Sequence, residues 1–152
     1  MQPQGKLIVL EGPDQALLDA LAGRLAAWLR EQGHAVMQTA EPTNGPGGMQ
    51  VQLYRGGRLR LDPGSAALTL VADRLDHLHK EQGLLERLGR GHHVLCVHYR
   101  LWDYLTLDQV PLDWQRRINA RCRPPDLTLY LGDGPDWLQD LAPQFVDPKV
   151  AI

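Results

Sequence analysis

The sequence predicts an α/β fold, a three-layer sandwich in which a mostly parallel sheet lies between two layers of helices. Three observations support this prediction. Four short apolar runs are spaced along the 152 residues, each continuous enough for a strand that is buried on both faces. Amphipathic helical patterns separate the runs, and this alternation is typical of parallel sheets. The composition, with 43% hydrophobic and 22% charged residues, is that of a globular protein, so we expect a single domain over residues 1–152.

The first third of the chain is predicted to form two strands with a helix between them. The strands are expected at Leu7–Leu10 and Ala35–Thr39. From Leu17 onward, apolar residues recur at helical spacing, and Gly33 is a residue type that commonly ends a helix. The run Glu41–Gly48, EPTNGPGG, is dense in turn-forming residues and predicts a loop.

A long central helix is predicted from about Ser65 to Leu88, and Gly83 is expected to bend or break it. Its inner side is expected to carry the apolar residues Leu68, Val71, Leu75, Leu78, Leu85 and Leu88. This stripe is apolar enough to serve as a contact between two copies of the chain.

The last third of the chain is predicted to contain two strands and one helix. The strands are His93–Val97 and Leu127–Leu131, and a helix follows Pro111, a residue type favoured in the first turn. The segment 144–147 is a candidate for a residual fifth strand. Leu131 is followed by 21 residues that contain no arginine.

Charge and composition exclude several classes of function. The formal net charge is −2 and the pI is about 6.3, so we expect neither a nucleic-acid partner nor an anionic-membrane partner. No run approaches the roughly 18 apolar residues that a membrane span needs, and the N-terminus does not read as a signal peptide. Two cysteines do not make a disulfide framework, and Cys96 is expected in the core. We therefore expect a cytoplasmic protein.

The stretch IVLEGPDQALLDALAGRLAAWL, residues 8–29, begins as a phosphate-binding loop does. An apolar strand runs into Glu11–Asp14, and an amphipathic helix follows. Such a loop binds phosphate through backbone N–H groups, a lysine and a hydroxyl that holds magnesium. The corresponding glycines, lysine and hydroxyl are absent from this stretch. No metal site is expected elsewhere, because His77 and His79 would point about 200° apart on a helix.

Five segments in order resemble the thymidylate kinases, which are P-loop nucleoside-monophosphate kinases. They are LIVLEGPD at 7–14, AAWLREQGHAV at 26–36, EPTNGP at 41–46, ADRLDHL at 72–78 and PDLTLYL at 125–131. The resemblance covers about residues 5–133 and implies a P-loop kinase fold. It also implies a degenerate, C-terminally shortened member of the family, in which the lid and the C-terminal helix are missing.

The departures from the family pattern fall at the phosphate loop. In the family register, Gln15 and Leu17 stand at the loop glycines, Leu18 at the lysine and Asp19 at the hydroxyl. A carboxylate ~5 Å from a phosphate charge is repelled by roughly 3 kcal/mol at an effective dielectric of ~20. We expect instead that Asp14 caps a helix that starts early, around Asp14 or Gln15.

Four residues retain the family's identity at positions that can bind a nucleotide: Glu11, Asp14, Glu41 and Arg74. The family arginine that matches Arg74 contacts the monophosphate. The other reading of Arg74 is an ion pair with Asp73, Asp76 or Glu41. His98, which falls at a catalytic arginine of the family, is expected to be structural or solvated, and no catalytic residue is assigned.

The resulting hypothesis is a pseudoenzyme without phosphotransfer activity that serves as a binding or dimeric assembly module. It predicts a homodimer through the helix around Leu68–Leu88, an unidentified protein partner as a second option, and no cofactor. One alternative is a divergent thymidylate kinase that uses MgATP, with phosphate ligands from Arg74 and the arginines of Arg55–Arg60. Another is a sensor that binds a nucleoside monophosphate at Arg74 and Glu41 without turnover.

Overall fold

A parallel sheet forms the centre of the computed structural model, which describes residues 4–133 and 145–146. The strands are β1 (Leu7–Glu11), β2 (Val36–Ala40), β3 (His93–Val97), β4 (Leu127–Tyr130) and β5 (Phe145–Val146). Their order in the sheet is β2-β3-β1-β4-β5, and every neighbouring pair is parallel. The prediction of an α/β fold with a parallel sheet is confirmed. The fifth strand falls within the predicted segment 144–147, whose two end residues lie outside the described part.

Strand β1 lies in the middle of the sheet between β3 and β4. Leu7 pairs with Val94 and Leu10 with Val97 on one side, while Glu11 pairs with Tyr130 on the other. Both faces of β1 and β3 are covered, which explains their continuous apolar sequences. The carboxyl ends of these strands meet at one edge, and ligands of open α/β sheets bind at such an edge.

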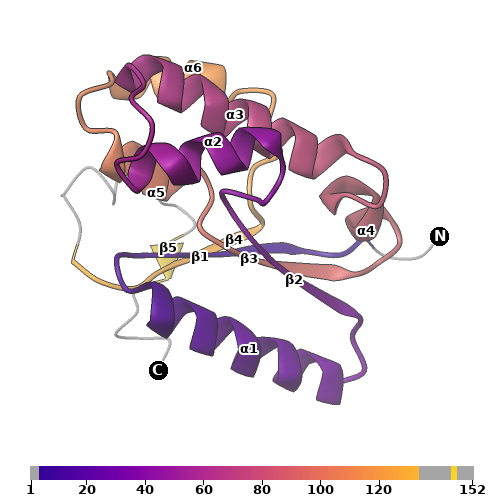
Figure 1. Ribbon diagram of the computed structural model, residues 1–152. Helices are drawn as coiled ribbons and strands as arrows, with labels where there is room; N and C mark the ends of the chain where they lie inside the picture. The colour runs from indigo at the N-terminus through magenta and orange to yellow at the C-terminus, as the bar shows by residue number, and fades with distance from the viewer. Residues whose placement is uncertain (1–3, 134–144, 147–152) are drawn as a thin grey trace.

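Helices cover both faces of the sheet (Figure 1). Helix α1 (Gln15–Glu31) lies alone on one face. The opposite face carries α2 (Pro46–Arg55), α3 (Pro63–His79), α4 (Leu84–Gly89), α5 (Arg100–Thr106) and α6 (Leu112–Ile118). The prediction of three layers is thus confirmed. Among the described residues, no helix is long and apolar enough to cross a membrane.

The prediction of a loop over Glu41–Gly48 is wrong at its end, because α2 already begins at Pro46. Proline suits the first turn of a helix, where its missing N–H is not needed. Gly48 is required for packing, since a Cβ there would lie 2.0 Å from the Thr43 carbonyl oxygen. Gly48 therefore permits a close approach of the α2 backbone to Thr43, which a count of turn formers does not reveal.

The predicted long helix is two helices. Helix α3 ends at His79 and α4 begins at Leu84, so Gly83 marks a break as expected. The placement of Leu68 on the inner side is wrong, because its side chain is 50% exposed. The small residues Ala66 and Ala67, together with Leu70, form the buried side instead, in one apolar cluster with Val51 of α2.

Helix α5 was not predicted at all. Its seven residues begin directly after Tyr99, and Leu101 and Tyr104 are buried. Cys96 is fully buried in the cluster beneath α3, as expected.

Candidate functional site

The connection from β1 to α1 consists of three residues, Gly12, Pro13 and Asp14. The Leu17 N–H donates to Asp14 Oδ1 at 3.1 Å, and the Leu18 N–H donates to the Asp14 carbonyl oxygen at 3.0 Å. Asp14 is therefore the N-cap, and α1 begins at Gln15. The prediction of an early helix start is confirmed.

The positions that align with the family's phosphate-binding residues all lie in the first turns of α1. Leu18 is fully buried in a cluster with Leu10 and Val97. Gln15 Nε2 donates to Asp19 Oδ1 at 3.1 Å on the exposed side of the helix. Leu17 is 49% exposed. None of these side chains carries a positive charge.

The Gly12 end of the connection is held against the neighbouring strands. Gly12 has a φ of 149°, and a Cβ there would lie 2.2 Å from the Leu131 carbonyl oxygen. Its own carbonyl oxygen accepts a hydrogen bond from His98 Nε2 at 2.8 Å. Burial lowers the pKa of His98, and its ring stacks on Trp102 with centroids 4.9 Å apart. His98 is thus structural, as expected.

Glu11 holds the start of α5. Its carboxylate accepts N–H hydrogen bonds from Tyr99 at 2.7 Å, Leu101 at 2.8 Å and Trp102 at 3.2 Å. Burial raises the pKa of Glu11 to about 8, although the N–H donors favour the charged form. The side chain is 1% exposed, so Glu11 faces the protein interior at the edge of the sheet.

Arg74 projects from α3 and is fully buried. Its Nε donates to Glu41 Oε1 at 2.8 Å, its Nη1 to Asn119 Oδ1 at 2.6 Å and its Nη2 to Asp103 Oδ2 at 2.5 Å. The guanidinium also lies 4.6 Å from the centre of the Tyr99 ring. Burial lowers the pKa of Arg74, but the two carboxylates outweigh this and raise it above the ordinary value. Each of the three guanidinium nitrogens therefore donates to a side-chain oxygen of the protein.

Further hydrogen bonds extend this arrangement. His77 Nδ1 donates to Glu41 Oε2 at 2.9 Å, and Arg55 Nη2 donates to Asp103 Oδ1 at 3.2 Å. We call these residues the Arg74 cluster: Glu41, Arg55, Arg74, His77, Asp103 and Asn119. Its two arginines balance its two carboxylates.

Sequence reasoning named Glu41 as one possible ion-pair partner of Arg74, and that pairing is present. It missed Asp103 and Asn119. The signal for Asp103 was a single acidic residue within the apolar run LWDYL. Asp73, another candidate partner, instead accepts hydrogen bonds from the Thr43 backbone N–H and hydroxyl.

The four candidate nucleotide-binding residues do not form one constellation. Glu41 and Arg74 are in direct contact, whereas Glu11 bonds to α5 and Asp14 caps α1 on the exposed surface. Within residues 4–133 and 145–146, no group of three His, Cys, Asp or Glu side chains is arranged to hold a metal ion.

Comparison with known proteins identifies the family of this chain. The family model described as thymidylate kinase matches residues 10–140. The chain is 36% identical to a probable thymidylate kinase of Staphylothermus marinus, covering 86% of this chain and 65% of that protein. It is also 36% identical to a thymidylate kinase of Xanthomonas oryzae pv. oryzae, covering 86% of this chain and 57% of that protein. The chain belongs to the thymidylate kinase family.

Solved structures of the family share the fold. Thymidylate kinase from Candida albicans aligns with a TM-score of 0.70 at 22% identity, over 85% of this chain and 63% of that one. Thymidylate kinase from Ehrlichia chaffeensis aligns with a TM-score of 0.72 at 21% identity, over 86% of this chain and 72% of that one. The chain spans 57–65% of the length of the two curated relatives named above.

Proposed function

We propose that this chain is a thymidylate-kinase-like pseudoenzyme that lacks phosphotransfer activity and acts as a binding or assembly module. The observation that carries the proposal is the segment after β1. No lysine or arginine occurs between Lys6 and Arg24, and Leu18, at the family's lysine position, is fully buried in the core. The segment has become an ordinary capped helix start.

MgATP does not fit this segment. A phosphate loop offers free backbone N–H groups and a lysine, but the Leu17 and Leu18 N–H groups are already bonded to Asp14. Asp14 and Asp19 add two exposed carboxylates where a polyphosphate would lie. Like charges at such a site oppose binding, so the proposal includes neither ATP nor magnesium as a cofactor.

The Arg74 cluster supports the same conclusion for a nucleoside monophosphate. A phosphate group that reached Arg74 would have to displace Asp103 or Glu41, because the guanidinium is fully buried and each of its three nitrogens already donates to a protein oxygen. Leaving a buried carboxylate without its partner costs about 3–5 kcal/mol. Asp103 in effect supplies the negative charge that a ligand would bring, which makes the sensor alternative less favourable.

Assembly is supported by apolar side chains on the outer helices. Met49 and Leu53 of α2 are 44% and 40% exposed, and Leu68 of α3 is 50% exposed. Helices α2 and α3 lie side by side (Figure 1). A second copy of the chain that packs on these helices would remove the three side chains from water, so we propose a homodimer through this face. An unidentified protein partner is the second candidate for it.

Isothermal titration calorimetry distinguishes the candidate functions. The proposal predicts no heat of binding for MgATP, and no binding of thymidine monophosphate that depends on Arg74. Binding of MgATP would support the kinase alternative. Binding of the monophosphate alone, lost in Arg74→Ala but retained in the surface variant Arg90→Ala, would support the sensor. Circular dichroism of each variant shows whether a loss of binding reflects a loss of folding.

A further inference from the structure

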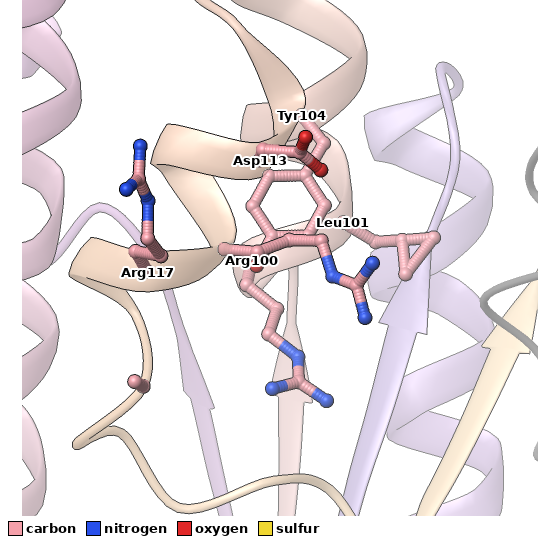
Figure 2. A pocket seen from close by; sticks show the side chains of 7 residues that line it. Arg100, Leu101, Tyr104, Asp113 and Arg117 are labelled. Carbon is pink, nitrogen blue, oxygen red and sulfur yellow. The ribbon is translucent and has the colours of Figure 1, made fainter.

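A pocket of about 730 Å³ lies between α5 and α6. Its lining includes Arg100, Leu101 and Tyr104 of α5 and Asp113, Arg116 and Arg117 of α6 (Figure 2). We call it the α5–α6 pocket. None of its lining residues belongs to the Arg74 cluster or to the segment after β1. The volume lies within the range of about 300–1,000 Å³ that is typical of small-molecule sites.

The charge of the α5–α6 pocket is unbalanced. Its lining carries three guanidinium groups and one carboxylate, a formal excess of two positive charges. In the described part of the chain, Arg100, Arg116 and Arg117 make no hydrogen bond and no ion pair. Arg55 and Arg90, by contrast, are both paired with acidic residues. The pocket arginines are therefore available to an external anion.

Tyr104 adds a hydroxyl group and an aromatic ring to the lining of the pocket. Its side chain lines the pocket, yet the residue is only 6% exposed. Within the described residues the Tyr104 hydroxyl makes no hydrogen bond. It is not among the buried polar atoms that lack a partner, so this oxygen is accessible to a ligand in the pocket. Burial raises the pKa of Tyr104, which keeps the phenol protonated and able to donate to an anion.

We propose that the α5–α6 pocket binds a phosphate monoester of a small hydroxylated molecule. Arginine binds phosphate oxygens through paired hydrogen bonds, more strongly than it binds neutral groups. A phosphate monoester carries a charge of about −1.5 to −2 at pH 7, which matches the positive excess of the lining. Asp113 is an acceptor for hydroxyl groups on the organic part, and Leu101 and the Tyr104 ring supply an apolar wall.

Calorimetry with three probes tests this site: ribose 5-phosphate, glucose 6-phosphate and glycerol 3-phosphate. We expect at least one to bind, and Arg116→Gln combined with Arg117→Gln to weaken it by about tenfold or more, because two charged donors are lost. Tyr104→Phe should weaken binding by about fivefold, the effect of one net hydrogen bond. The matched control is Arg24→Gln on α1, an exposed arginine on the other side of the sheet, which should leave binding unchanged.

Four results would overturn the proposal. They are no binding of any of the three probes, equal affinity for inorganic phosphate, undiminished affinity in the pocket variants, and stronger binding of a polyglutamate peptide than of the probes. Thermal unfolding of each variant confirms that it is folded. Because the pocket shares no residue with the Arg74 cluster, failure here leaves the proposal of a pseudoenzyme untouched.

Discussion

Replacing Asp103 by asparagine tests whether the Arg74 cluster is a self-sufficient structural unit. The Asp103 side chain is 7% exposed, and its carboxylate accepts hydrogen bonds from both Arg74 and Arg55. The amide keeps the shape of the side chain and one acceptor oxygen but removes the charge. Losing one partner of a buried ion pair costs about 3–5 kcal/mol. Since Arg74 keeps Glu41 and Asn119, we expect a loss near the lower end, about 3 kcal/mol.

Urea unfolding followed by circular dichroism measures this loss. The free energy of unfolding should fall by about 3 kcal/mol with little change in the m value, because the surface exposed on unfolding stays the same. The matched control is Glu86→Gln, which breaks an exposed ion pair with Arg90 and should cost about 0–1 kcal/mol. If Asp103→Asn costs no more than this control, the buried carboxylate does not hold Arg74 and the reasoning fails.

Three further predictions address other parts of the chain. The pKa of Glu11 is raised from 4.5 to about 8 in the folded state, so the stabilisation by its protonated carboxyl group is present below about pH 4.5 and is lost as the pH rises through 8. Thermal unfolding should show this loss of stability in the wild type and not in Glu11→Gln. Parallel pH profiles of the two proteins would refute the prediction. The double variant Leu53→Glu with Leu68→Glu should be a monomer by light scattering after gel filtration, where the wild type is a dimer. The control Leu17→Glu, at a similarly exposed position on α1, should remain a dimer. A double variant that stays dimeric would exclude the α2–α3 face as the dimer contact. Leu18→Lys should lower the free energy of unfolding by about 3 kcal/mol or more, because it buries an unpaired charge. Calorimetry should still show no MgATP binding to this variant. A stable variant that binds MgATP would contradict the assigned core position of Leu18.

The parts of the fold that the sequence predicted are those determined by local patterns. The buried strands are short continuous apolar runs, so their positions could be read to within a residue or two. The start of α1 is also local, because Asp14 caps a helix whose N–H groups lie three and four residues ahead. The break near Gly83 follows from one residue type.

The features that were missed depend on contacts between distant segments. Arg74 bonds to Asp103, 29 residues away, and to Asn119, 45 residues away, and nothing in the local sequence links them. The exposed position of Leu68 depends on which side of α3 receives α2. Helix α2 begins at Pro46 and packs Gly48 closely against the Thr43 backbone, a contact between segments that a loop-like composition conceals.

The most direct test of the pseudoenzyme proposal is a coupled phosphotransfer assay with MgATP and thymidine monophosphate. With Leu18 buried at the lysine position and Arg74 fully paired within the protein, we predict no turnover above the background without protein. Turnover above that background, abolished by Arg74→Ala in a folded variant, would contradict the proposal.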